Sequence, residues 1–255
     1  MKNLYQDPWF DCFRPNPRSA LRFFCWPYAG GGAGFYRAWS RYLPANIEVC
    51  GVQLPGHHPR LSVPPYTRLA PLVEATAEAI APYLNRPFAF FGHSMGALVS
   101  FELTRLLRRE KSPMPFRLFV SGRRAPQAPD TRVPNYHLPL TQFIEVLRRL
   151  DGTPREALES KELMAVMTPI LRADFAVCQT YEYQPEVPLA CPITAFGGTE
   201  DEETADGRLT AWRDQTTASF SSFVFPGGHF FLRSAEKPLL NALRQALYNH
   251  GRGTA

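Results

Sequence analysis

The chain has 255 residues, 45% of them hydrophobic and 13% aromatic, and this composition excludes an intrinsically disordered protein. It contains no run of about 20 apolar residues and no apolar segment near its start resembling a secretory signal, so we expect a cytoplasmic protein without membrane contact. The formal net charge of +5 is compatible with an acidic partner, but no nucleic-acid-binding motif accompanies it, and we expect no nucleic acid partner.

The first predicted core strand is Leu21–Trp26, which follows an irregular, proline-containing arm over residues 1–20. It leads into a glycine-rich segment, 27–34, and then into helical spacing at 35–39. A phosphate-binding loop is one interpretation, but the P-loop lysine is absent and a Gly-x-Gly-x-x-Gly pattern would need glycine at Phe35 or Arg37. We favour the alternative, a loop that directs a backbone N–H group toward a catalytic serine.

A second strand is predicted at residues 47–54, and it ends in the turn 55–59. This turn carries His57 and His58 beside prolines. Histidines in such loops are usually solvated, and we assign them no catalytic part. Apolar residues with helical spacing then predict a helix over residues 69–84.

The most informative segment is an apolar run at 88–91, a Gly-x-Ser-x-Gly turn at 92–96 and a helical pattern that continues to about 109. Gly92 and Gly96 lack the Cβ atoms that would keep a strand and a helix apart in so tight a turn. Ser94 is then held at the positive end of the helix, where an attacked carbonyl oxygen would be stabilised. A glycine-rich helix start capped by serine is the alternative, but the flanking strand and helix favour a nucleophile.

Another strand is predicted at 116–121, and the pattern changes after about residue 126. Up to residue 188, prolines alternate with amphipathic helical stretches at 140–150 and 162–181, without a clear strand. About sixty residues exceed the usual crossover length and indicate a helical lid insertion, with ordinary crossover helices as the alternative. Apolar side chains of this segment either line a pocket or pack together, and we favour packing. They include Phe143, Leu147, Met164 and Met167.

The remaining elements are a strand at 192–198, an acidic loop, a helix at 208–215, a strand at 220–225 and a closing helix at 238–248. Strands that alternate with helices predict a mostly parallel sheet covered by helices on both faces. Neither a repeat nor a linker divides the chain. We therefore expect one α/β domain over residues 1–255, with the helical lid at 126–188 inserted in it.

A serine nucleophile needs a base, and the base needs an acid that fixes its tautomer. His229 lies in a glycine-rich turn directly after the last predicted strand, which leaves its ring free to reach Ser94. His93 adjoins the serine and is expected to point to the opposite face. His137 lies in the predicted lid, and His250 lies near the end of the chain.

The acid is expected in the loop after the strand at 192–198. Asp201 is the preferred candidate because it lies a short turn beyond the end of that strand. Its neighbours are usually solvated in such a loop, although Glu200 or Glu202 stays open as a replacement. The alternating ligand spacing of a calcium loop is missing. The acidic residues of the loop are Glu200, Asp201, Glu202, Glu203 and Asp206.

The cysteines predict neither a disulfide framework nor a zinc site, because their number is odd and no two are spaced as Cys-x-x-Cys. We expect each to be a small buried hydrophobic residue. The five are Cys12, Cys25, Cys50, Cys178 and Cys191. No metal ion and no cofactor is expected.

Positive charge is concentrated between residues 101 and 132. This stretch is either a solvated surface or a docking site for an acidic partner. It contains Arg105, Arg108, Arg109, Lys111, Arg117, Arg123, Arg124 and Arg132 against Glu102, Glu110 and Asp130.

The chain resembles the free-standing type II thioesterases that accompany polyketide and non-ribosomal peptide synthetases and, more distantly, the medium-chain acyl-carrier thioesterases. The resemblance runs over nearly the whole length. The chain differs from the family pattern at Thr199, where relatives often carry an acidic residue. It also differs at His57 and His58, where many relatives have an arginine. Seven segments carry it: Pro-Tyr-Ala-Gly-Gly-Gly (27–32), Gln-Leu-Pro-Gly (53–56), Gly-His-Ser-Met-Gly-Ala (92–97), Ser-Gly-Arg-Arg-Ala-Pro (121–126), Leu-Arg-Ala-Asp-Phe (171–175), Gly-Gly-x-x-Asp (197–201) and Pro-Gly-Gly-His-Phe-Phe (226–231).

This resemblance implies an α/β-hydrolase fold with a Ser94, His229 and Asp201 triad, and oxyanion donors in the backbone of Met95 and Ala29. It implies hydrolysis of aberrant acyl groups from the phosphopantetheine arm of acyl or peptidyl carrier proteins, which would be the partners of a monomeric enzyme. The alternatives are a small-molecule carboxylesterase or acyl-CoA hydrolase with the same triad, an acyltransferase, and an inactive carrier-binding scaffold.

Overall fold

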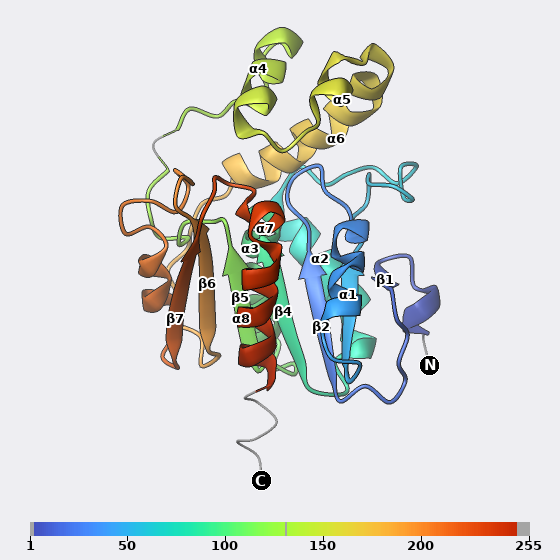
Figure 1. The fold of residues 1–255 in the computed structure, drawn as a ribbon, viewed down its shortest axis with the longest axis vertical. Coiled ribbons are helices and arrows are strands. Elements are labelled where there is room, and N and C mark those ends of the chain that lie inside the picture. Colours follow the sequence, from blue (N-terminus) through green and yellow to red (C-terminus); the bar gives the residue numbers. More distant parts are fainter. Residues whose placement is uncertain (1–2, 131, 249–255) are drawn as a thin grey trace.

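A seven-stranded, mostly parallel sheet forms the centre of the molecule in the computed structural model, which describes residues 3–130 and 132–248 (Figure 1). The strand order is β1-β3-β2-β4-β5-β6-β7, and only the β1–β3 pair is antiparallel among these. The strands are β1 (Phe10–Cys12), β2 (Leu21–Trp26), β3 (Ile47–Val52), β4 (Phe88–His93), β5 (Arg117–Ser121), β6 (Ile193–Gly198) and β7 (Phe220–Phe225). This topology confirms the predicted α/β-hydrolase fold class.

Helices cover both faces of the sheet, as the continuous apolar strands require. One face packs against α2 (Leu69–Ile80) and α3 (Met95–Arg109), and the other packs against α1 (Trp39–Tyr42), α7 (Phe231–Ser234) and α8 (Glu236–Tyr248) (Figure 1). Short 3₁₀ segments complete the layers: η1 (Leu4–Gln6), η2 (Ala33–Arg37), η3 (Ala81–Tyr83) and η4 (Thr210–Gln215).

The strands divide their side chains between the two cores with a period of two. Phe24 and Phe90 belong to the core under α2 and α3, whereas Phe23 and Phe91 belong to the core under α8. All four are fully buried. The central strand β4 is therefore buried along its whole length, because each residue has a core to enter.

Residues 126–188 contain α4 (Leu140–Leu150), α5 (Arg155–Glu159) and α6 (Lys161–Gln179), which lie above one end of the sheet (Figure 1). α5 was not predicted. The two longer helices agree with the amphipathic stretches, and their apolar faces form a small core of their own. Phe143, Leu147 and Met164 are buried in that core, with Met167 packed against it, so these side chains pack together as expected.

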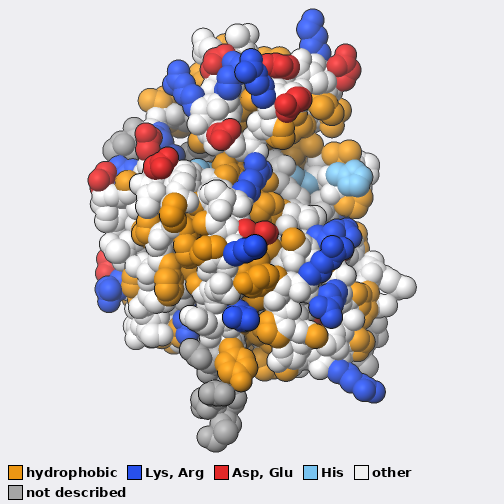
Figure 2. Space-filling model, in the orientation of Figure 1, with side chains coloured by type: hydrophobic (Ala, Val, Ile, Leu, Met, Phe, Trp, Pro, Cys, Tyr) orange, Lys and Arg blue, Asp and Glu red, His pale blue; other side chains and the backbone are white. Residues whose placement is uncertain are grey.

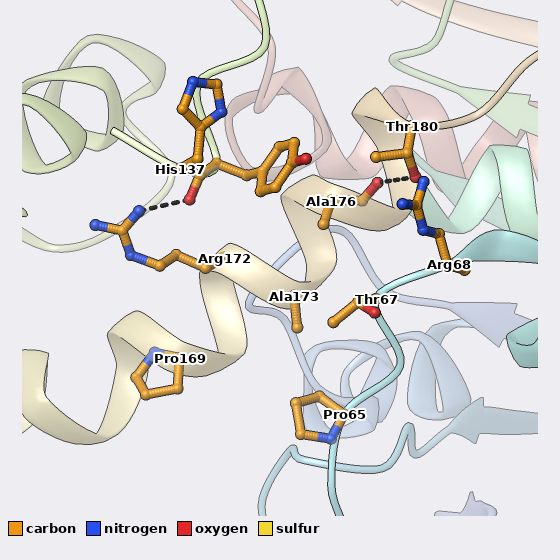
Figure 3. Close-up of a pocket in the computed structure, with 10 residues that line it drawn as sticks. Pro65, Thr67, Arg68, His137, Pro169, Arg172, Ala173, Ala176 and Thr180 are labelled. Carbon is orange, nitrogen blue, oxygen red and sulfur yellow. Dashed lines mark hydrogen bonds between the residues drawn. The ribbon is translucent and has the colours of Figure 1, made fainter. Parts of the chain in front are cut away.

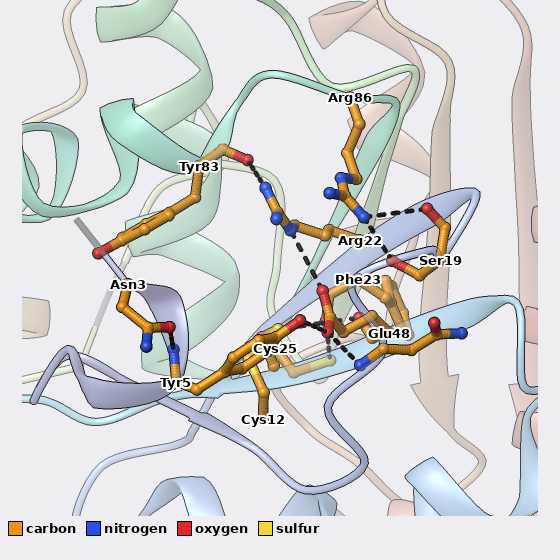
Figure 4. Close-up of a disulfide and its surroundings, with 12 residues drawn as sticks. Asn3, Tyr5, Cys12, Ser19, Arg22, Phe23, Cys25, Glu48, Tyr83 and Arg86 are labelled. Atoms are coloured by element: carbon orange, nitrogen blue, oxygen red, sulfur yellow. Dashed lines mark hydrogen bonds and ion pairs between the residues drawn. A yellow bond between two sulfur atoms is a disulfide. The ribbon is translucent and has the colours of Figure 1, made fainter. Parts of the chain in front are cut away.

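The N-terminal arm is more ordered than predicted. Its residues 10–12 form β1 opposite β3, and Cys12 and Cys50 occupy facing positions and form a disulfide (Figure 4). Tyr5 adds a 2.9 Å hydrogen bond to Glu48, which also pairs with Arg22 at 3.2 Å (Figure 4). The expectation of five unpaired cysteines was therefore wrong for this pair, because cysteines 38 residues apart meet only through strand pairing.

Among residues 3–130 and 132–248, no helix combines the length and apolar character needed to cross a lipid bilayer.

Candidate active site

Ser94 occupies a strained turn between β4 and α3. Its backbone has φ 53° and ψ −112°, a conformation that residues other than glycine rarely adopt. The turn closes because two glycines allow backbone to touch backbone. A Cβ on Gly92 would lie 2.0 Å from the Gly96 carbonyl oxygen, and one on Gly96 would lie 2.3 Å from the Trp26 oxygen. The sheet and α3 thus hold the serine hydroxyl out of both cores.

His229 lies between Ser94 and Asp201. Its Nε2 is 3.0 Å from the Ser94 Oγ, and its Nδ1 is 3.0 Å from the Asp201 Oδ1. An ionised carboxylate only accepts, so Nδ1–H donates to Asp201, and Nε2 accepts the hydrogen bond from the Ser94 hydroxyl. The structure therefore brings the three predicted side chains into one hydrogen-bonded chain from three different strand ends.

Asp201 is the carboxylate of the acidic loop that reaches the imidazole. It is only 4% exposed, and its Oδ1 also accepts the Glu203 N–H at 3.1 Å. Glu200 and Glu202 are exposed. The loop meets the histidine turn closely, since a Cβ on Gly198 would lie 2.4 Å from the Gly227 oxygen. This close contact between the β6 and β7 turns sets the position of the carboxylate relative to the ring.

Two backbone N–H groups near the serine have no hydrogen-bond partner among the described residues. One belongs to Met95, the first residue of α3, and the other to Ala29 in the glycine-rich loop. The loop is a tight turn closed by a 2.8 Å bond from the Gly31 N–H to the Tyr28 oxygen. Its preceding residues touch α3, because a Cβ on Gly96 would also lie 2.7 Å from the Pro27 oxygen. Such free donors at a helix N-terminus suit a developing oxyanion.

Comparison with known proteins identifies the family of the chain. Residues 22–247 match the thioesterase domain family. The chain belongs to the thioesterase family. It is 47% identical over 239 residues to the gramicidin S biosynthesis protein GrsT of Aneurinibacillus migulanus, covering 94% of this chain and 93% of that protein.

Solved structures agree with this assignment. The RedJ thioesterase of the prodiginine pathway in Streptomyces coelicolor superposes with a TM-score of 0.84 at 40% identity, over 89% of this chain and 90% of that one. The type II thioesterase BorB from the borrelidin cluster superposes with a TM-score of 0.87 at 32% identity, over 95% and 99% of the two chains. The protein is therefore a thioester hydrolase.

In this thioesterase, Glu203 is buried and paired with arginines, whereas the sequence suggested a solvated residue. It is 7% exposed, and its Oε1 lies 2.8 Å from Arg124 and 3.5 Å from Arg123. Its Oε2 lies 2.6 Å from Arg132. Arg124 and Arg132 also contact Asp130. These arginines follow β5, so they tie the loop that carries Asp201 to the neighbouring strand end.

The other basic residues of the stretch 101–132 are also largely neutralised within the thioesterase. Arg105 is 3% exposed and pairs with Glu102 at 2.6 Å and Glu186 at 2.8 Å. Arg108 and Arg109 bind the same Glu186 at 2.5 and 2.7 Å. Most of the cations of this stretch thus already have a carboxylate partner within the chain, and docking of an acidic partner by this stretch stays a prediction.

The remaining histidines have different surroundings. His93 is fully buried, with Nδ1 2.9 Å from the Ser121 Oγ and its ring centroid 5.1 Å from that of His229. Burial, with a smaller contribution from the neighbouring His229, holds its pKa well below the usual range, so it stays neutral. His58 is exposed, as expected, but His57 is buried and bound to Asp174 of α6, which corrects the expectation of a solvated ring. His250 lies outside the described residues.

A groove of about 710 Å³ lies on α6, where Pro169, Arg172 and Ala173 face Pro65 and Thr67 of a neighbouring loop (Figure 3). His137 lies at this groove and not at the hydrogen-bonded chain. Arg172 turns to the Tyr136 and Leu138 carbonyl oxygens, which ties α6 to the segment before α4. None of Ser94, His229 and Asp201 lines this groove.

Proposed function

We propose that this thioesterase removes acyl groups from the phosphopantetheine arm of acyl and peptidyl carrier proteins, with Ser94, His229 and Asp201 as its catalytic residues. The observation that carries the proposal is the chain of two 3.0 Å hydrogen bonds from the serine Oγ through the imidazole to the carboxylate. This is the arrangement in which a serine hydroxyl becomes a nucleophile. The strained backbone of Ser94 supports the same role, since strain concentrates at functional positions.

In the acylation step, the Ser94 Oγ attacks the thioester carbonyl carbon while His229 Nε2 takes the hydroxyl proton. The negative charge that develops on the carbonyl oxygen is stabilised by the N–H groups of Met95 and Ala29. The C–S bond then breaks, and the thiol leaves with the proton from His229. A serine ester of the acyl group is left on the enzyme.

In the deacylation step, water attacks the serine ester and gives its proton to His229. The oxyanion again lies at the Met95 and Ala29 N–H groups, and Ser94 leaves with the proton from the imidazole. Throughout the cycle Asp201 stabilises the imidazolium and keeps Nδ1 protonated. No metal and no cofactor takes part in this proposal.

The choice of a carrier-borne substrate rests on the relatives. GrsT is a gramicidin S biosynthesis protein, RedJ comes from a prodiginine biosynthetic pathway, and BorB is a type II thioesterase of a borrelidin cluster. Identities of 32–47% over most of the chain support a role for this enzyme beside a peptide or polyketide synthetase. We further propose that it acts in the cytoplasm, because its substrate would be made there, and that it acts as a monomer.

The test is a panel of carrier proteins loaded with different acyl groups, incubated with the wild-type enzyme and with Ser94→Ala. The proposal expects release of free acid by the wild type and a loss of at least about 10⁴-fold in the variant. Matched oxygen esters, acyl-CoA and added thiol acceptors serve as competing substrates. Preference for an oxygen ester or acyl-CoA, or acyl transfer to an added thiol, would contradict it.

A further inference from the structure

One buried carboxylate of the lid helix α6, that of Asp174, binds both the His57 ring and the glycine-rich loop. The Asp174 Oδ2 lies 2.9 Å from the His57 Nε2 and accepts the Gly30 backbone N–H at 2.7 Å. Both the histidine and the aspartate side chains are 5% exposed. One carboxylate oxygen thus binds two separate loops, one of which carries Ala29.

The surroundings of His57 require a proton on each ring nitrogen. Its Nδ1 lies 3.1 Å from the Pro55 carbonyl oxygen and its Nε2 faces the Asp174 carboxylate, and both partners are acceptors. Only the imidazolium donates to two acceptors at once. Among the described residues, Asp174 is the charged group that contacts the ring. The nearby Arg60 guanidinium lies 4.4 Å from the Trp9 ring centroid and donates to the Gln53 oxygen instead.

The same helix holds Gly30 by a second contact. A Cβ on Gly30 would lie 2.5 Å from the Leu171 Cδ2, one helical turn before Asp174, so α6 lies directly on the turn. Gly30 has φ +74°, and the turn is closed from Gly31 to Tyr28. The Gly30 N–H bond to Asp174 and the Gly31 N–H bond to Tyr28 fix the conformation of the turn. Ala29 is part of the same turn, so this conformation also sets the direction of its N–H group.

We propose that His57 and Asp174 are positioning residues that hold the Ala29 N–H in its orientation for the oxyanion and so couple the lid helix to the catalytic step. The inference rests on the proposed function, in which Ala29 is an oxyanion donor. Neither residue touches the reacting atoms. Their effect is on the geometry of the loop, because a donor misplaced by about 1 Å stabilises the transition state much less well.

The pair also makes the loop sensitive to pH. Burial by itself lowers the His57 pKa, but the Asp174 carboxylate and the backbone carbonyls outweigh it and bring the pKa above its ordinary value. A group whose pKa is raised in the folded protein stabilises it below that pKa and ceases to do so as the pH rises through it. The loop is therefore held most firmly below the ordinary pKa of histidine, and less firmly as the pH rises through the raised pKa of His57.

The experiment compares four enzymes on a small acyl thioester of N-acetylcysteamine, so that no carrier contact contributes. Asp174→Ala is expected to lower kcat about 100-fold with little change in KM, because the lost interaction acts on the transition state. His57→Arg keeps a positive donor that does not titrate, and it is expected to keep its kcat at high pH, where the wild type declines. Val166→Ala is the control on the same helix, because that side chain is 54% exposed, and its kcat is expected to stay near that of the wild type.

The inference would be overturned if the kcat of Asp174→Ala equalled that of the wild type. It would also be overturned if the kcat of His57→Arg declined in alkaline solution as the wild-type kcat does. Thermal unfolding is measured for each variant, and where Asp174→Ala does not fold, the two pH profiles decide. Failure of the proposed function is a separate result, since it appears as undiminished hydrolysis of the same thioester by Ser94→Ala.

Discussion

Asp201 and Glu202 are adjacent carboxylates with opposite surroundings. The Asp201 side chain is buried against His229, whereas Glu202 points into solvent. Only the first can fix the tautomer of the ring, because this needs an acceptor within hydrogen-bond distance of Nδ1. The structure therefore separates two residues that the sequence left as alternatives.

Substitution of Asp201 by asparagine tests this difference. We expect Asp201→Asn to lower kcat about 10⁴-fold, because an amide in place of the carboxylate favours the wrong imidazole tautomer. The measurement is hydrolysis of a small acyl thioester at pH 7. Glu202→Gln is the matched control and should keep wild-type kcat. Equal losses in the two variants would mean that the loop, and not the Asp201 carboxylate, matters.

The sequence predicted Ser94, His229 and Asp201 because each follows the end of a recognisable strand. It did not predict the burial of His57 or Glu203, which lie in loops with polar and proline-rich sequences. Their partners, Asp174 and Arg124, are 117 and 79 residues away along the chain. No local pattern indicates such pairs, since they form only when the elements pack.

At the scale of elements, the turn between β4 and α3 depends on the absence of two side chains. Gly92 and Gly96 are placed so that an added Cβ would meet backbone atoms of Gly96 and Trp26, which cannot move aside as a flexible side chain can. The Gly-x-Ser-x-Gly pattern is thus a packing requirement of the strand and helix as well as a signature of chemistry.

We expect Gly96→Ala to destabilise the protein by about 3 kcal/mol or more, because overpacking against fixed backbone has no easy relief. The midpoint of urea unfolding measures this. Gly34→Ala is the matched control, since a Cβ there would meet nothing within 4 Å, and its stability should change by less than about 0.5 kcal/mol. If Gly96→Ala unfolded at the same urea concentration as Gly34→Ala, the turn would be able to accommodate the added Cβ, contrary to our expectation.

The long elements were predictable from hydrophobic periodicity, and the short ones were not. β2, β4, α3 and α6 agree with the sequence pattern to within a few residues. β1 and α5 have three and five residues, too few for a period to be visible. β1 owes its strand conformation to pairing with β3, which also explains the Cys12–Cys50 bond.

At the scale of the whole molecule, the net charge of +5 does not form one basic patch on the face drawn in Figure 2. Lysines and arginines are scattered among acidic and apolar side chains on the face drawn in Figure 2. Many arginines of the stretch 101–132 pair with the partly exposed Glu186 or with the buried Glu203. We therefore expect the best-buried of them to contribute to stability.

Arg105 is the most deeply buried arginine of this stretch, and its removal tests whether the arginine pairs stabilise the fold. Arg105→Ala removes a buried guanidinium from Glu102, which keeps the Tyr181 hydroxyl, and from Glu186, which keeps Arg108 and Arg109. We expect a loss of about 2 kcal/mol, or a fall in Tm of roughly 4–8 °C. KM for an acyl-loaded carrier and for a small thioester should change alike. Arg155→Ala breaks an exposed pair with Glu159 and should leave Tm unchanged. A rise in KM confined to the carrier substrate would instead support this stretch as a docking site.

The most direct test of the catalytic proposal is the site of the covalent intermediate. The enzyme is mixed with an acyl-loaded carrier protein, quenched within one turnover, digested and examined by mass spectrometry. The account predicts that the acyl mass is carried by the peptide containing Ser94 and is absent from Ser94→Ala. An acyl group on another residue, or undiminished hydrolysis by Ser94→Ala, would contradict it.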